Sequence, residues 1–299
     1  MDQKNTNFEE TALSFLPHHL SEAVRKSLSL YRGNVSELRL RSGGAVAITS
    51  GDKNIITPVR CTQSDIGYTV RALCGNSLYS HSETIKEGYI CTEGGIRAGV
   101  CGRAVTENSQ IISVTDISSV CIRIPHRVPG AADGICRLVF NEGFRGMIIY
   151  SPPGVGKTTA LREFVARLSQ RPYNLRIAVI DTRFEICGGL SEELSCDALS
   201  GYPRAKGMET ALRTLSPQLI VCDEIGSEMD SEAIKSSFGS GVPTVASAHS
   251  ATFAELISKP HIKELWDMGA FTYAVGLKRD HGKFELQIDS FCPDTKGDF

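Results

Sequence analysis

Residues 151–159 have the sequence Ser151-Pro152-Pro153-Gly154-Val155-Gly156-Lys157-Thr158-Thr159. The apolar run from Met147 to Tyr150 precedes this stretch, and a helical pattern follows it to about Gln170. Glycines in such a turn let several backbone N–H groups converge on one point, and the start of the following helix adds positive potential there. A strand, a glycine-containing turn, Lys-Thr and a helix together predict a phosphate-binding P-loop.

The loop predicts roles for its side chains. We expect Lys157 to reach the β- and γ-phosphates of a nucleotide and the Thr158 hydroxyl to bind Mg²⁺. The usual pattern begins with glycine, whereas this one begins with Ser151. Because serine adopts most loop conformations except those with positive φ, we expect the departure to weaken nucleotide binding slightly without abolishing it. The alternative is an ordinary glycine turn, which the strand before it and the apolar stripe of the helix argue against.

Composition sets the protein class. The chain of 299 residues is long enough for two domains, and 41% hydrophobic with 22% charged residues is typical of a soluble globular protein. A net charge of −2 gives no general basis for binding nucleic acid. The ten cysteines include no Cys-x-x-Cys pair, so we expect them to be reduced. Without a secretory signal or a run of bilayer-spanning length, the chain is expected to be cytoplasmic and to meet a membrane through partners or a surface helix.

The sequence changes character near Pro125, Pro129 and Gly130, where we place a domain boundary. Short alternating strands before it predict a smaller α+β domain, residues 1–130, with mainly antiparallel pairing. Continuous apolar strands alternating with helices predict an α/β domain, residues 131–299, with a parallel-rich sheet. In this second domain we expect strands at 146–150, 176–181, 218–222, 244–248, 273–277 and 284–288, and helices near 157–170, 206–215, 228–239 and 252–268.

Acidic residues follow two of the expected strands, and a histidine follows a third. Asp223 and Glu224 end an apolar strand in the form that holds Mg²⁺ and polarises an attacking water, although a helix whose first turn favours acids is the alternative. Asp181 and Glu185 end another strand, and His249 ends a third. Because parallel strands bind ligands at their carboxyl ends, we expect these residues near the phosphate loop. His249 is either a sensor of the γ-phosphate or a structural histidine.

The stretches 151–159, 180–185, 219–224 and 244–249 resemble, in this order, the Walker A, aspartate box, Walker B and histidine box of the secretion-type ATPases of the RecA-like superfamily. The segment 212–218, Leu-Arg-Thr-Leu-Ser-Pro-Gln, is similar to their approach to Walker B. The similarity is closer still to a sporulation branch, the stage III sporulation protein AA family. It is carried by residues 36–41, Ser-Glu-Leu-Arg-Leu-Arg, by 94–103 and by 223–226, Asp-Glu-Ile-Gly, and extends from about residue 35 to about 290.

This resemblance implies a RecA-like ATPase core that binds ATP and Mg²⁺ and that follows a smaller α+β domain in the chain. It also implies a homo-hexameric ring on the cytoplasmic side of a membrane, partnered by membrane proteins of a secretion-like channel during sporulation. Arginines of the N-terminal domain reach the nucleotide in such ATPases, and Arg97 and Arg123 lie in similar strand contexts, with Arg103 as a further candidate.

The aspartate box departs from the acid spacing of the secretion enzymes, which leaves the general base open between Glu224 and Glu185. We prefer Glu224 because it directly follows Asp223, the residue linked to the metal.

Two other functions remain compatible with these motifs. A nucleotide-gated scaffold would bind ATP to assemble a ring with little turnover, in keeping with Ser151. A nucleic-acid motor is the second, since the RecA-like fold also hosts helicases and a fold does not fix a function. The slightly acidic net charge argues against the motor, so no nucleic-acid partner is expected.

Overall fold

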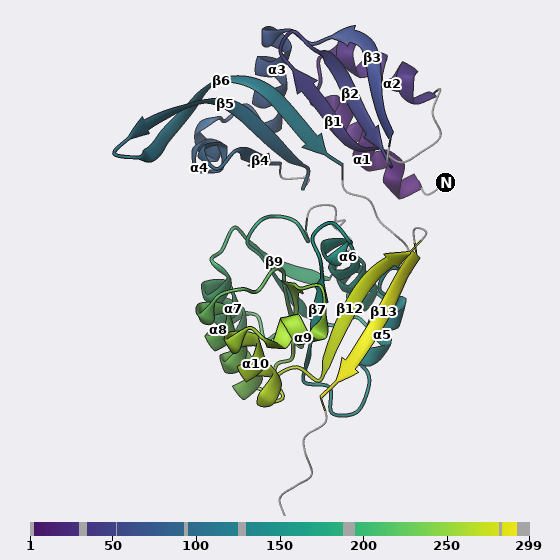
Figure 1. The fold of residues 1–299 in the computed structure, drawn as a ribbon, viewed down its shortest axis with the longest axis vertical. Coiled ribbons are helices and arrows are strands. Elements are labelled where there is room, and N and C mark those ends of the chain that lie inside the picture. Colours follow the sequence, from purple (N-terminus) through teal and green to yellow (C-terminus); the bar gives the residue numbers. More distant parts are fainter. Residues whose placement is uncertain are drawn as a thin grey trace, which may run out of the picture. The chain divides into compact units, whose positions relative to one another are not determined.

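A computed structural model describes residues 3–29, 35–51, 53–92, 95–124, 130–187, 195–280 and 283–291 (Figure 1). The chain divides into two compact units, Met1–His126 and Arg127–Phe299, which we call unit 1 and unit 2. Residues 125–129 lie outside the described residues, so the boundary expected after residue 130 stays a prediction.

Unit 1 contains one antiparallel sheet of six strands in the order β3-β2-β1-β6-β5-β4, together with short helices. Its elements are α1 Gln3–Ser14, α2 His18–Ser29, β1 Val35–Arg41, β2 Ala45–Ser50, β3 Lys53–Arg60, α3 Gln63–Leu73, the 3-10 helix η1 Tyr79–His81, α4 Ser82–Lys86, β4 Tyr89–Cys91, β5 Arg97–Glu107 and β6 Gln110–Arg123. Leu38 and Leu40 of β1 are buried in the core, and the alternating Arg39 and Arg41 lie on the opposite face of the sheet.

The hairpin of β5 and β6 is longer than the strands beside it. Its ladder continues to Glu107↔Gln110, whereas β4 pairs only as far as Gly99 and β1 pairs only with residues 119–123 of β6. Figure 1 shows it as a curved ribbon that extends past the other strands. Asn108 and Ser109 at its tip both have positive φ, as a tight hairpin turn requires.

Unit 2 contains one sheet of seven strands in the order β13-β12-β7-β11-β10-β8-β9. Its elements are α5 Asp133–Leu138, β7 Gly146–Ser151, α6 Lys157–Leu168, β8 Ile177–Asp181, β9 Cys196–Ser200, α7 Arg204–Thr214, β10 Leu219–Cys222, α8 Glu228–Gly239, β11 Thr244–His249, α9 Phe253–Ile257, α10 Pro260–Asp267, β12 Tyr273–Asp280 and β13 Lys283–Ser290. Neighbouring strands run parallel except for the β12–β13 hairpin, which confirms the predicted parallel-rich sheet.

Both faces of this sheet are buried. Along β7, Met147 and Ile149 belong to a core cluster that includes Phe164 of α6. Ile148 and Tyr150 belong to a second cluster, which includes residues of α7, α8 and α10. Helices on both faces explain why the central strands are continuous apolar runs rather than alternating ones.

Strand order determines which loops are neighbours. β7, β11, β10 and β8 are adjacent and parallel, so their carboxyl ends lie along one edge of the sheet. These ends are Ser151, His249, Cys222 with the following Asp223, and Asp181. The residues singled out in the sequence of unit 2 therefore share this edge.

Candidate nucleotide-binding site

The loop between β7 and α6 is shaped by two glycines. Gly154 and Gly156 have φ values of 80° and 121°, in the range that favours glycine. A Cβ on Gly156 would also lie 2.8 Å from Cζ of Phe284 in β13, so this position has no room for a side chain. Ser151 is not among the described residues with positive φ, because it is the last residue of β7. The Ser-for-Gly departure therefore introduces no backbone strain.

Lys157 is the first residue of α6 and is only 5% exposed. Its Nζ donates to the carbonyl oxygen of Ser151 at 2.8 Å and to that of Pro152 at 3.3 Å. It also lies 3.0 Å from Nδ1 of His249. Burial lowers the pKa of Lys157, and the nearby carboxylates of Asp223 and Glu224 partly oppose this shift. The ammonium is thus held at the mouth of the loop.

Thr158, Asp223 and Ser247 form a hydrogen-bonded group. Thr158 Oγ1 donates to Asp223 Oδ2 at 3.0 Å, and the Ser247 hydroxyl donates to Asp223 Oδ1. A hydroxyl and one carboxylate are the hard oxygen ligands that Mg²⁺ takes from proteins, while phosphates and water supply the rest. Among the described residues, no group of three or more His, Cys, Asp or Glu side chains is placed to hold a metal ion.

Glu224 lies next to this group in a conformation uncommon for its residue type, with φ of 47°. Its backbone N–H donates to Ser247 Oγ and to Asp223 Oδ1, both at 3.0 Å. Its Oε1 lies 2.7 Å from His249 Nε2, and its Oε2 accepts from Arg183 Nη1 at 2.6 Å. Both carboxylate oxygens are therefore engaged.

His249 connects Lys157 to Glu224. The ammonium of Lys157 only donates hydrogen bonds, so Nδ1 of His249 accepts the one from Nζ. A neutral imidazole then carries its proton on Nε2 and donates it to Glu224 Oε1. The structure thus brings together Lys157, Thr158, Asp223, Glu224 and His249, as the sequence predicted for this edge.

Asp181 lies in the same region, and its carboxylate closes the turn that follows β8. Its carboxylate accepts the backbone N–H groups of Glu185, Ile186 and Cys187 at 2.7–3.0 Å. Burial raises the pKa of Asp181, and these N–H groups oppose that rise. Arg162 of α6 donates to the carbonyl oxygens of Glu185 and Ile186. Hydrogen bonds to Asp181 and Arg162 therefore hold the backbone of the turn that contains Glu185.

Arg97 and Arg123 lie in unit 1 and are cross-strand partners of β5 and β6. With Arg39 and Arg41 of β1 they line a hollow of about 340 Å³. The Arg97 guanidinium lies 4.4 Å from the centroid of the Tyr89 ring. Four arginines on neighbouring strands make this hollow a basic surface.

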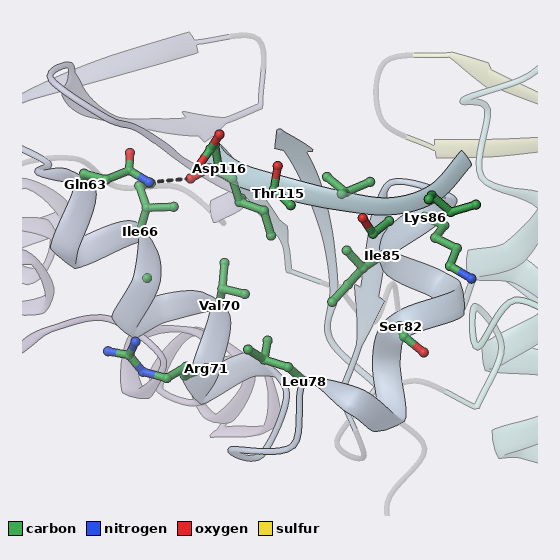
Figure 2. Close-up of a pocket in the computed structure, with 15 residues that line it drawn as sticks. Gln63, Ile66, Val70, Arg71, Leu78, Ser82, Ile85, Lys86, Thr115 and Asp116 are labelled. Atoms are coloured by element: carbon green, nitrogen blue, oxygen red, sulfur yellow. Dashed lines mark hydrogen bonds between the residues drawn. The ribbon is translucent and has the colours of Figure 1, made fainter. Parts of the chain in front are cut away.

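A second hollow of unit 1 is apolar. It has a volume of about 410 Å³ and lies between α3, α4 and β6. Figure 2 shows Val70, Leu78 and Ile85 pointing into it, while Gln63 Nε2 donates to the carbonyl oxygen of Ile117 at its edge. Neither Arg97 nor Arg123 lines it.

The site also contains residues that the sequence alone does not single out. Ser247 binds both Asp223 and Glu224, and its signal was a serine within a strand of otherwise apolar character. Arg183 pairs with Glu224 across 41 residues, and no local pattern predicts that contact. Arg39 and Arg41 fit the alternating pattern of a half-buried strand, and this pattern does not indicate that they lie beside Arg97 and Arg123.

Solved structures identify the fold. The ATPase DotB of Legionella pneumophila is similar to this chain with a TM-score of 0.62 and 15% identity, over 94% of this chain and 82% of that protein. The pilus retraction motor PilT, solved with bound ADP, is similar with a TM-score of 0.63 and 14% identity, over 92% of this chain and 83% of PilT. At this identity the likeness shows the fold alone, which is the RecA-like P-loop fold of the secretion ATPases.

In the part of the chain that the structure describes, none of the helices has the length and apolar character needed to cross a bilayer.

Sequence comparison identifies the family. Stage III sporulation protein AA of Bacillus subtilis is 29% identical over 277 residues, which cover 89% of this chain and 90% of that protein. The model of the family described as "Sporulation stage III, protein AA" matches residues 13–288. The chain therefore belongs to the sporulation stage III protein AA family.

Proposed function

We propose that the protein is a Mg²⁺-dependent ATP hydrolase that works as a homo-hexameric ring and energises a secretion-like membrane channel complex during sporulation. The observation that carries the proposal is the convergence of Lys157, the Thr158–Asp223 pair and the Glu224–His249 pair at one sheet edge. The family name and the ATPases of the same fold point to the same activity.

In this proposal the P-loop backbone and Lys157 hold the phosphates. The N-terminus of α6 has no side-chain cap and no acidic residue in its first turn, so its N–H groups and positive potential are available to an anion. Lys157 exchanges the carbonyl oxygens of Ser151 and Pro152 for phosphate oxygens. Thr158 and Asp223 hold Mg²⁺, which when bound neutralises charge on the β- and γ-phosphates.

We assign the attacking water to Glu224 rather than to Glu185. The Glu224 carboxylate shares His249 with Lys157, whereas the backbone of Glu185 is committed to the turn around Asp181. Because Lys157 donates to His249, movement of Lys157 onto a γ-phosphate changes the hydrogen bonding of His249 and so reaches Glu224. His249 is accordingly the proposed γ-phosphate sensor. Catalysis of this kind needs positioning and charge neutralisation rather than covalent chemistry.

The ring and its location are also part of the proposal. Arg97 and Arg123, in the basic hollow of unit 1, are the proposed arginines that reach a nucleotide across a subunit boundary. The protein acts on the cytoplasmic side of the membrane, which it meets through integral membrane partners. PilT, whose solved form is named as a motor with bound ADP, supports a mechanical use of the nucleotide.

The test is phosphate release from the full-length protein with Mg·ATP, measured across protein concentrations. Turnover that is lost in Lys157→Ala and rises more than proportionally with concentration is the expected result. Glu224→Gln should bind ATP and cleave it slowly. Binding without turnover would favour the nucleotide-gated scaffold, and stimulation by DNA or RNA with salt-sensitive binding would favour the nucleic-acid motor.

A further inference from the structure

The carboxylate of Glu224 is held from two sides. His249 Nε2 lies 2.7 Å from Oε1, and Arg183 Nη1 lies 2.6 Å from Oε2. The two contacts come from different strands, since His249 ends β11 and Arg183 follows β8, on either side of β10. Glu224 itself directly follows the end of β10 and Asp223, so the three side chains meet above neighbouring strand ends.

The backbone that carries Arg183 is fixed. Asp181, two residues earlier, accepts the N–H groups of Glu185, Ile186 and Cys187, which closes the turn around Arg183. The half-buried side chain of Arg162 then binds the carbonyl oxygens of Glu185 and Ile186 to α6. The backbone of the turn that carries Arg183 is therefore held by α6, the helix that begins with Lys157.

The two contacts to Glu224 are not equivalent. His249 also accepts from Lys157, so its hold on Glu224 depends on where the lysine lies. The contact from Arg183 comes from the turn after β8 and involves neither Lys157 nor His249. Arg183 can keep the carboxylate in place while the lysine and histidine rearrange around a phosphate.

We propose that Arg183 is a positioning residue, which acts through Glu224 by fixing its carboxylate for the attacking water. The Arg183 side chain is 58% exposed, so its ion pair with the 24% exposed Glu224 is not a requirement of the core. The ion pair acts by orienting the Glu224 carboxylate, because a small misplacement of a catalytic group lowers the rate strongly. This inference rests on the proposed hydrolysis of ATP.

The experiment measures kcat and KM for ATP with the full-length wild type, Arg183→Gln, Arg183→Lys, Glu224→Gln and the Arg183→Gln/Glu224→Gln double variant. Arg167→Gln is the matched control, because Arg167 is an exposed arginine of unit 2 whose partner is Asp133 on α5. We expect Arg183→Gln to lower kcat about 10- to 100-fold with little change in KM. Arg183→Lys should restore part of the rate, and Arg167→Gln should match the wild type.

The double variant separates positioning from other roles. If Arg183 acts through Glu224, then Arg183→Gln causes no further loss once Glu224 is glutamine. An equal fractional loss in both backgrounds would overturn the inference, because Arg183 would then act independently of Glu224. A wild-type kcat in Arg183→Gln would also overturn it.

A readout without turnover distinguishes failure of this inference from failure of the proposed function. In proton–nitrogen spectra of the full-length protein, we expect separate guanidinium signals from Arg183 that collapse in Glu224→Gln. If the wild type shows no Lys157-dependent turnover, the proposed function fails, and the inference as a statement about catalysis fails with it. If turnover is present and the guanidinium signals are unaffected by Glu224→Gln, only the inference fails.

Discussion

The hydroxyl of Thr158 lies 3.0 Å from Oδ2 of Asp223, although the two residues are 65 positions apart in the chain. One belongs to the first turn of α6 and the other follows β10, so the contact joins the phosphate loop to the acidic strand end. Ser247 holds the other oxygen of Asp223 and thereby fixes the orientation of the carboxylate. The two oxygen groups that we propose as ligands of Mg²⁺ are in this way aligned by the fold.

Removing the carboxylate of this pair should weaken the binding of Mg²⁺. We expect Asp223→Ala to raise the Mg²⁺ concentration for half-maximal turnover by about 10-fold or more, because even residues that only support a metal site change its affinity by that order, and Asp223 is a proposed ligand. Turnover is titrated with Mg²⁺ at fixed ATP. Thr158→Ser keeps a hydroxyl and is the control. An unchanged Mg²⁺ dependence in Asp223→Ala would remove Asp223 from the metal site.

A side chain at Gly156 should destabilise the phosphate loop. Gly156→Ala combines a φ of 121° with a Cβ 2.8 Å from Phe284 Cζ, and we expect a loss of about 2 kcal/mol in the free energy of unfolding. Urea unfolding measures it. Gly239→Ala is the control, because a Cβ there meets no atom within 4 Å. Adding Phe284→Ala to Gly156→Ala should recover part of the loss, and equal effects at Gly156 and Gly239 would contradict the prediction.

The predictable part of the fold is the part that is buried on both faces. β7, β8, β10 and β11 each contain a run of buried and mostly apolar residues, which marks them in the sequence. β9 was not expected, because only Leu199 of its five residues is buried and no apolar run exists there. The helix expected over 252–268 is in fact two, α9 and α10, because Pro260 begins a new helix at its first position.

A residue of the site was predictable from the sequence only where it lies at the end of an apolar strand. Asp223, Glu224 and His249 each follow an apolar run, so parallel pairing alone places them on one edge. The contact of Arg183 with Glu224 depends on β8 lying beside β10, and that of Ser247 with Asp223 depends on β11 lying on the other side. Strand order is a property of the whole sheet, and no spacing along the chain contains it.

Asp230 should support the loop that carries Glu224. Its carboxylate accepts the N–H groups of Gly226 and Ser227 and pairs with Arg204 at 2.8 Å. Burial alone would raise the pKa of Asp230, but the Gly226 N–H and the Arg204 guanidinium outweigh it, so the pKa is lowered. Its stabilisation is therefore present above the ordinary value of 3.8 and is lost as pH falls through the lower, folded-state pKa.

Asp230→Asn should accordingly cost about 3 kcal/mol at pH 7, because it leaves the Arg204 charge mostly buried without a counter-charge. Urea unfolding at pH 7 and at successively lower pH measures the difference from the wild type, which should narrow as the pH falls below 3.8. Glu209→Gln, at an exposed ion pair on α7, is the control and should change stability much less. A difference that does not depend on pH would contradict the role of the charge.

We expect the buried charge of Lys157 to lower the stability of the fold, although the proposed function requires this lysine. Burial lowers its pKa below the ordinary 10.5, so the unfolded chain binds this proton more tightly than the folded one. Stability should therefore rise with pH between the lowered pKa and 10.5. Lys157→Met removes the charge but keeps much of the chain length, so its Tm relative to the wild type should be highest near pH 7 and should fall as the pH approaches 10.5.

Thermal unfolding of both proteins across this pH range provides the measurement. Lys206→Met, at an exposed lysine of α7, controls for the general effect of pH on the fold. A gap between Lys157→Met and the wild type that stays constant or widens toward alkaline pH would show that the ammonium is not penalised by burial. The expected narrowing, together with loss of turnover in Lys157→Met, would mean that the loop keeps a desolvated charge because the phosphates require it.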